Sequence, residues 1–191
     1  MIVLTGPSAS GKTATCLYLQ AHFGIKKVIT HTTRQRRKGE VNNVDYHFVT
    51  IDEFRKRKAN DEFIETTFYN GNYYGTSRKE VQIDKCRAVE GAGAKTYKSF
   101  HDPKIVLFYR LLDEQTRRER RESRGDDLEK IKSRLLNDEK SFRLDDERKQ
   151  IVDVYVDTKK YDIPSVSEFI YNKYLEVLKK NGVDVSTLVK L

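Results

Sequence analysis

A glycine-rich segment near the N-terminus has the residue types and spacing of a phosphate site. Residues 6–13 fit the pattern G-x-x-x-x-G-K-[ST], directly after an apolar strand and directly before a helix. The glycines let backbone N–H groups point at a phosphate, and the helix N-terminus adds positive potential. Lys12 can reach the β- and γ-phosphates, and the Thr13 hydroxyl can hold Mg²⁺. The alternative is a glycine-rich turn with a solvated lysine. The pattern predicts a nucleoside triphosphate on Gly6, Ser8, Ala9, Ser10, Gly11, Lys12, Thr13 and Ala14.

Further blocks follow this loop in a fixed order. Residues 32–40 read TTRQRRKGE, residues 45–48 read DYHF, residues 63–65 read FIE, and residues 71–77 read GNYYGTS. With the loop they cover the first 77 residues almost continuously, and in this order they closely resemble guanylate kinase. The resemblance implies transfer of a phosphoryl group from ATP to GMP (and dGMP), giving GDP and ADP. It also implies a GMP site at Thr30, Arg34, Arg37, Tyr46, Glu65, Tyr74, Thr76 and Glu90.

The residue types at this second site suit GMP chemically. Guanine presents N1–H and an exocyclic NH₂ side by side, so the Glu65 carboxylate can accept from both, whereas adenine places an acceptor at N1. Arginine suits a monophosphate because its planar fork donates two bonds at once. The alternative is that Glu65 and Tyr74 are ordinary surface residues of a small sheet. The resemblance implies that Arg34, Arg37, Tyr46 and Tyr74 bind the phosphate and that Glu65, Thr76 and Thr30 read the base.

Glu90 begins a segment that resembles the family's D-x-x-G-A-K motif. An acidic residue at this place in the family ends a strand beside both nucleotides, and glutamate stands here instead of aspartate. The preceding residues 84–89 make a poor strand, and the stretch after Ser77 is shorter than is usual in the family. The resemblance implies that Glu90 contacts guanine or a water bound to Mg²⁺. The alternative is a surface charge at the end of a strand.

An arginine-rich helix is predicted at residues 114–123. Arg117, Arg120, Arg121 and Arg124 recur at i, i+3, i+4 and i+7, which places four cations on one face. A solvated helix can have this pattern, but an anion lying on the face would also explain it. The family has lid arginines before an R-G pair and in a following I-x-x-R-L, and this sequence matches both. Because the transition state of phosphoryl transfer spreads charge over several oxygens, catalysis depends on placing cations. The resemblance implies catalytic roles for Lys12, Arg37, Arg120, Arg124 and Arg134.

The elements that must position these residues alternate between strand and helix. Apolar or β-branched runs at residues 1–5, 28–29, 45–49, 104–112 and 151–156 predict strands. Helices are expected after residue 13, at 50–58, 114–123 and 127–149, and in a closing helix capped by Ser165 and Glu168. The alternation predicts an α/β fold with a parallel sheet flanked by helices, of the P-loop NTPase type. The closing helix is expected to bury Val166, Phe169, Ile170, Tyr174, Val177 and Leu178, as the first is expected to bury Cys16, Leu17, Leu19 and Phe23.

An inserted β-rich lobe is expected within this core. Asn70-Gly71 between two strand-like runs predicts a tight hairpin, so residues 31–77 are expected to form a small β-rich lobe, and the resemblance implies that this lobe binds GMP. The remaining boundaries follow from the resemblance. It implies one guanylate-kinase-like domain over residues 1–191, with a core at 1–30, 78–115 and 139–191 and a helical lid at 116–138.

Composition limits the class of protein. The 191 residues include 37 Lys and Arg against 29 Asp and Glu, a formal charge of +8 that favours anionic partners. No apolar run approaches the ~20 residues of a membrane span. Cys16 and Cys86 form neither a disulfide framework nor a metal site, so we expect a cytoplasmic protein. The expected partners are ATP with Mg²⁺, and GMP, with neither a membrane nor nucleic acid.

Three other functions stay open at this stage. One is a related P-loop kinase acting on another nucleotide or a phosphorylated sugar. Another is a non-catalytic guanylate-kinase-like binding module, although such modules typically lose the loop lysine that is retained here as Lys12. The third is a basic nucleic-acid-binding protein, for which the sequence has no recognised motif.

Overall fold

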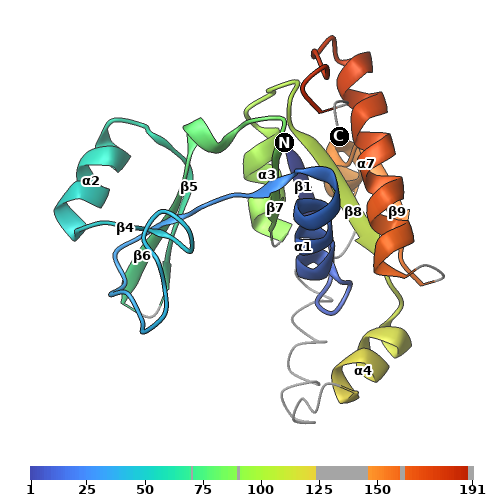
Figure 1. Cartoon of the computed structure of the whole chain (residues 1–191), viewed down its shortest axis with the longest axis horizontal. Helices are drawn as coiled ribbons and strands as arrows, with labels where there is room; N and C mark the ends of the chain where they lie inside the picture. The colour runs from blue at the N-terminus through green and yellow to red at the C-terminus, as the bar shows by residue number, and fades with distance from the viewer. Residues whose placement is uncertain (70, 90, 124–145, 160–161, 189–191) are drawn as a thin grey trace.

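The core of the molecule is a parallel sheet covered by helices on both faces (Figure 1). The computed structural model describes residues 1–69, 71–89, 91–123, 146–159 and 162–188. Its sheet has the order β2 (Lys26–Lys27), β7 (Lys85–Ala88), β1 (Ile2–Thr5), β8 (Val106–Leu111) and β9 (Val154–Asp157), with every pair parallel. No helix in these ranges is long and apolar enough to cross a membrane. The predicted α/β fold is confirmed.

Alternate side chains of β1 pack against opposite layers of helices. Ile2 and Leu4 belong to the core cluster with α1 (Lys12–Phe23) and α7 (Ile163–Lys180). Met1 and Val3 belong to the cluster on the other face, with α3 (Gly91–Lys98). This two-sided burial is the reason that the N-terminal run is apolar at every position. It fixes the end of β1, and with it the start of the glycine-rich loop.

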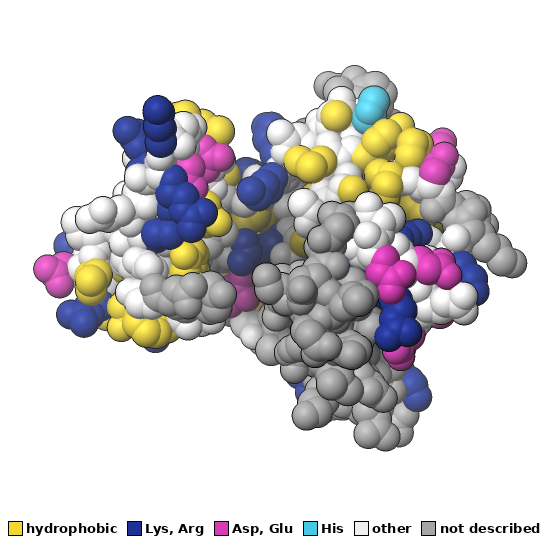
Figure 2. All heavy atoms as spheres, turned by 90° about the horizontal axis from the view of Figure 1, so that it is seen from below, with side chains coloured by type: hydrophobic (Ala, Val, Ile, Leu, Met, Phe, Trp, Pro, Cys, Tyr) yellow, Lys and Arg dark blue, Asp and Glu magenta, His cyan; other side chains and the backbone are white. Residues whose placement is uncertain are grey.

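A second sheet lies beside the core. Its order is β4 (His47–Phe48), β3 (His31–Thr32), β6 (Asn72–Ser77) and β5 (Phe63–Tyr69), and α2 (Ile51–Ala59) packs on it. We call this sheet and α2 the lobe. Tyr69 pairs with Asn72 and Gly71 has φ +77°, so the predicted tight hairpin is confirmed. Seen from below, the lobe and the core flank a hollow in which basic side chains are exposed (Figure 2).

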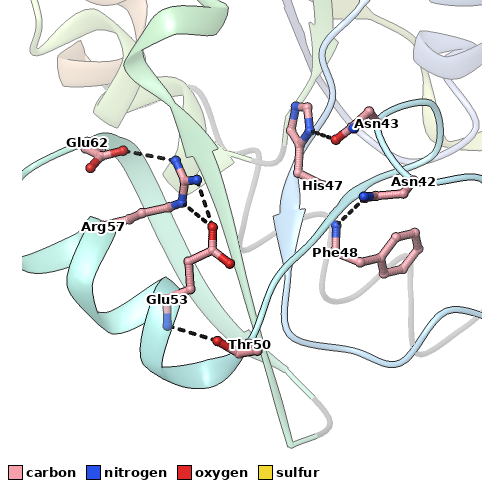
Figure 3. A network of polar contacts seen from close by, with 8 residues as sticks. All are labelled: Asn42, Asn43, His47, Phe48, Thr50, Glu53, Arg57 and Glu62. Atoms are coloured by element: carbon pink, nitrogen blue, oxygen red, sulfur yellow. Dashed lines mark hydrogen bonds and ion pairs between the residues drawn. The ribbon is translucent and has the colours of Figure 1, made fainter.

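Side-chain hydrogen bonds hold α2 and the short strand β4 in the lobe (Figure 3). Thr50 Oγ1 accepts from the Glu53 N–H at 3.1 Å, which confirms the predicted N-cap of α2. Arg57 pairs with Glu53 at 2.8 Å and with Glu62, next to β5, at 3.1 Å. Phe54 on the same helix stacks on Phe63 at 4.7 Å between ring centroids. These contacts attach α2 to the strand that carries Glu65.

Several predicted strands differ from those observed. The strand expected at 28–29 lies at Lys26–Lys27, because the ladder with β7 begins there and reaches Val28 only through its N–H to Cys86 O. The strand expected at 45–49 contains only His47–Phe48, and that expected at 151–156 begins at Val154, after α6 (Asp146–Ile151). The poor strand sequence at 84–89 nevertheless forms β7, second in the sheet, because it pairs with strands on both sides.

Two helices bury fewer side chains than their apolar residues suggested. In α7 the buried positions include Val166, Ile170, Tyr174 and Leu178, four residues apart, while Phe169 is 43% exposed. Leu17 of α1 is 59% exposed, because Cys16 and Leu19 turn toward the sheet and Leu17 lies about 100° around the helix from Cys16. The cap of α7 is also corrected. It is Asp162, which accepts from the Ser165 N–H at 2.8 Å, rather than Ser165 itself.

Candidate nucleotide-binding site

The glycine-rich loop passes very close to β8. A Cβ atom added to Gly6, whose φ is +133°, would lie 2.6 Å from the carbonyl oxygen of Arg110. Gly11 caps α1 in the left-handed conformation, with φ 82°. Only glycine fits both positions without strain. The loop therefore carries the backbone from the end of a buried strand to the N-terminus of α1, as an anion site requires.

Lys12, the first residue of α1, has its ammonium group against the loop. Its Nζ donates to Gly6 O at 2.5 Å and to Pro7 O at 2.9 Å. Thr13, the next residue, is exposed at the start of the helix. Among the other residues predicted for the triphosphate, Ser10 is buried, Ser8, Ala9 and Gly11 are half-buried and Ala14 is exposed. The loop thus gathers a cation and a hydroxyl at one helix end.

A second cation reaches the same loop from α4 (Glu114–Glu122). Arg120 donates to Ala9 O and to Thr158 O, each at 3.3 Å. The helix is anchored by Asp113, which accepts from the Thr116 N–H at 2.9 Å, and such bonds lower the pKa of Asp113 to about 2. Arg120 is therefore placed at the phosphate loop although it lies 108 residues after Lys12 in the sequence.

The other arginines in and after α4 differ in their burial and in whether the structure describes them. Arg121 is 2% exposed, so the alternative of a fully solvated helix does not hold for it. Arg117 is half-buried, and Arg118 pairs with Glu122, four residues on, at 4.0 Å. Arg124 and Arg134, predicted to be catalytic, lie outside the described residues, as do most of the predicted helix 127–149 and Glu90.

In the lobe, the residues predicted to bind a monophosphate gather around Arg34. Its guanidinium carbon lies 5.4 Å from the Tyr46 ring centroid, and the Tyr46 and Tyr74 rings are 6.2 Å apart. Arg34 donates to Glu40 at 2.6 Å, a hydrogen bond that raises the pKa of Arg34 and lowers that of Glu40. Arg37 differs, since its backbone N–H bonds Glu40 at 2.7 Å and its side chain is exposed.

A pocket between the lobe and β7 is lined or flanked by the residues that are predicted to read the base. Thr76 donates to Glu65 Oε1 at 3.2 Å. Thr30 and Glu65 both accept a hydrogen bond from one further residue. That partner is Arg87, which donates to Thr30 Oγ1 at 2.7 Å and to Glu65 Oε1 at 2.6 Å. Arg87 is not among the site residues predicted from the sequence. Its only signal there was an arginine within residues 84–89, which lacked a convincing strand pattern.

Three cavities adjoin along β7. One of about 430 Å³ is lined by Glu65, Tyr74 and other residues, and one of about 490 Å³ by Thr30, Tyr46 and others. A third of about 290 Å³ reaches Thr13 at the start of α1. Arg87 and Ala88 line all three. The cavities therefore run from the phosphate loop to the lobe, and each is near or within the size range of small-molecule sites, about 300–1,000 Å³.

Arg110 is a second residue that sequence analysis missed. It is 1% exposed in β8 and donates to Gly11 O at 3.4 Å and to Thr15 Oγ1, so its guanidinium lies under the phosphate loop. Burial, and then the charge of Arg120, lower its pKa to about 10. The signal was an arginine inside the apolar run 104–112, which predicts a strand.

Comparison with known proteins shows the family of this chain. The sequence matches the family model described as guanylate kinase over residues 1–162. A protein named guanylate kinase from Fusobacterium nucleatum is 31% identical over 160 residues, which cover 80% of this chain and 86% of that protein. Another, from Symbiobacterium thermophilum, is 34% identical over 143 residues, 71% of this chain and 68% of the other.

A solved structure supports the fold as well. The crystal structure of guanylate kinase from Anaplasma phagocytophilum aligns with a TM-score of 0.60 and 21% identity, covering 100% of this chain and 89% of that one. At that identity the likeness concerns the fold alone. The family follows from the sequence matches: this chain belongs to the guanylate kinase family.

Proposed function

We infer that the chain transfers the γ-phosphoryl group of ATP to GMP, giving ADP and GDP. Family membership supports this reaction. The observation that carries it is the line of adjoining cavities from Thr13, beside the phosphate loop, to Glu65 in the lobe. A kinase with two nucleotide substrates needs neighbouring sites for them, because the acceptor must meet the γ-phosphate in line.

ATP is proposed to lie on the loop from Gly6 to Ala14. Phosphoryl transfer has a loose transition state, so the protein contributes mainly position and positive charge. Lys12 and Arg120, which both contact the loop, would neutralise charge on the transferred group. The GMP phosphate is itself the nucleophile and is already ionised at neutral pH, so no general base is needed. Arg37, Arg124 and Arg134 are proposed as further catalytic cations, the last two within a lid at residues 116–138.

Mg²⁺ is the proposed cofactor, with Thr13 as its protein ligand. The residues fit this ion, because Mg²⁺ in kinases is held by one or two protein oxygens with substrate phosphates and waters, not by an all-protein cage. Thr13 is exposed at the start of α1, directly after Lys12. When bound, Mg²⁺ would supply charge neutralisation between the β- and γ-phosphates.

GMP is proposed to occupy the lobe side, residues 31–77, with the flanking Thr30. Arg34, Arg37, Tyr46 and Tyr74 would bind its phosphate, and Glu65 with Thr76 and Thr30 its base. Glu90 is proposed to act beside both nucleotides. Since both substrates are nucleotides of the cytoplasm, we propose that compartment for the enzyme.

An assay of ADP release with different acceptors tests the function. GMP and dGMP should support turnover with ATP and Mg²⁺, whereas AMP, CMP, UMP and ribose bisphosphate should not. Failure of GMP while another acceptor works would instead indicate a related kinase. GMP binding by calorimetry with no turnover at all would indicate a non-catalytic module.

A further inference from the structure

The arginine on β7 stands where the base of the acceptor is proposed to bind. Arg87 donates to Glu65 Oε1 at 2.6 Å, and both side chains are about one-fifth exposed, 22% and 23%, and line the same pocket. Glu65 is on β5 in the lobe, whereas Arg87 is on β7 in the core sheet, paired with Val3 of β1. The two sheets therefore meet at this ion pair, inside the pocket.

Together the two side chains present one donor followed by two acceptors. The order is Arg87 Nη2, Glu65 Oε1 and Glu65 Oε2, because Arg87 bonds Oε1. The Watson–Crick edge of guanine presents the complement in the same order, with O6 as acceptor followed by N1–H and the NH₂ group as donors. The reverse orientation of the base would set the NH₂ donors against the guanidinium N–H groups. Only one orientation of guanine matches all three groups.

We propose that Arg87 is a specificity-determining residue, which donates to guanine O6 while Glu65 accepts from N1–H and the NH₂ group. This rests on GMP being the acceptor. Adenine is excluded twice over, because its N6–H₂ group would face the guanidinium and its N1 acceptor would face a carboxylate oxygen.

Neighbouring groups hold both side chains in place for this role. Thr76 donates to Glu65 Oε1 at 3.2 Å, and Tyr97 does so at 3.5 Å. Oε2 faces Gly93, where an added Cβ would lie 3.3 Å from it. Arg87 Nη1 is held by Thr30 Oγ1 at 2.7 Å. A site in which the polar groups are already oriented discriminates strongly against a base that leaves them unpaired.

The test compares three acceptors in variants of one position. GMP is compared with 6-thio-GMP, in which a weakly accepting sulfur replaces O6, and with IMP, which keeps O6 but lacks the NH₂ group. Arg87→Met should lower kcat/KM for GMP by about 10- to 100-fold, the loss expected for one hydrogen bond to a charged group. The same substitution should change kcat/KM for 6-thio-GMP by less than about threefold. It should leave the ratio of kcat/KM for GMP to kcat/KM for IMP nearly unchanged. Arg87→Lys, which keeps a cationic donor, should restore part of the preference for O6.

A merely structural ion pair predicts a different pattern. If Arg87 only positions Glu65, Arg87→Met will lower kcat/KM for all three acceptors by the same factor, and that result would overturn the proposal. No change with any acceptor would overturn it as well. Arg78→Met is the matched control, because Arg78 pairs with Asp61 at 2.7 Å without lining the pocket. ATP binding by calorimetry shows that each variant is folded. Lack of turnover with GMP in the unmodified chain would refute the proposed function itself, a separate result.

Discussion

The buried Arg110 under the phosphate loop is expected to lower the stability of the nucleotide-free protein while it strengthens nucleotide binding. We expect Arg110→Met to make the nucleotide-free protein more stable and its binding of ATP weaker. In the described part of the chain Arg110 forms no ion pair, and its hydrogen bonds go to the neutral oxygens of Gly11 and Thr15. It also lies near Arg120, whose charge adds to the positive end of α1. Balancing negative charge would arrive with the triphosphate.

The size of the effect follows from the pKa of Arg110. A fall from 12.5 to about 10 means that the charged form is disfavoured in the folded protein by about 3 kcal/mol. Because the folded pKa lies below the unfolded one, this penalty is fully present at any pH below 10, including pH 7.5. Methionine removes the penalty but loses two hydrogen bonds of about 1 kcal/mol each, so the net gain is about 1 kcal/mol. For phosphates bound on the loop, one charge at an assumed separation of about 10 Å and an effective dielectric constant of about 20 contributes about 1.5 kcal/mol, so losing it would weaken ATP binding about tenfold.

Urea unfolding at pH 7.5, without nucleotide, measures the first effect, and calorimetry with ATP and Mg²⁺ measures the second. Arg118→Met is the control, because the exposed pair of Arg118 with Glu122 should contribute less than about 0.5 kcal/mol. The reasoning is refuted if Arg110→Met lowers the free energy of unfolding by more than about 1 kcal/mol while ATP affinity is unchanged. Arg110 would then be a hydrogen-bonding residue of the fold.

Three further predictions concern the loop, the base pocket and the lobe. Lys12→Ala should lower kcat by at least about 100- to 1,000-fold with an unchanged far-ultraviolet spectrum, and normal turnover would exclude its catalytic role. Glu65→Gln should raise KM for GMP about 10- to 100-fold and leave the Kd for ATP unaltered, whereas equal losses for both nucleotides would contradict a role in reading the base. Burial, and then the charge of His47, lower the pKa of His31 to about 4 from 6.5, so the unfolded chain binds more protons between these values and stability should fall as pH falls through that window. The loss in urea unfolding should be at most about 3 kcal/mol and should be smaller in His31→Phe.

Local sequence alone predicted those elements that depend only on residues close together in the chain. The phosphate loop needs glycine at positions 6 and 11 because of backbone conformation and close approach, and the spacing to Lys12 and Thr13 shows this directly. The hairpin at residues 70–71 follows equally from turn chemistry. Ordered motifs also predicted the family, which the comparisons confirm.

The exposure of individual side chains was harder to predict, because it depends on which neighbouring element packs against each face of a helix or strand. Phe169 and Leu17 have the same hydrophobicity signals as buried neighbours but lie beyond the edge of the contact with the sheet. The strand β7 has little β-forming sequence, and its place between β2 and β1 supplies the pairing that its composition does not indicate. Tertiary pairing thus overrides local propensity at these positions.

The positions of Arg87 and Arg110 beside the candidate site were decided by tertiary structure alone. Arg87 meets Glu65 and Arg110 meets Gly11 only because strands from distant parts of the chain end beside the lobe and the loop. Sequence information shows which residues can bind phosphate by their spacing within one loop, and which residues are expected to read a base by the resemblance of the ordered motifs to a family. It does not show which charges are brought together across 22 residues, as for Arg87 and Glu65, or 99 residues, as for Arg110 and Gly11, because that depends on strand order and on the low-dielectric interior in which the charges meet.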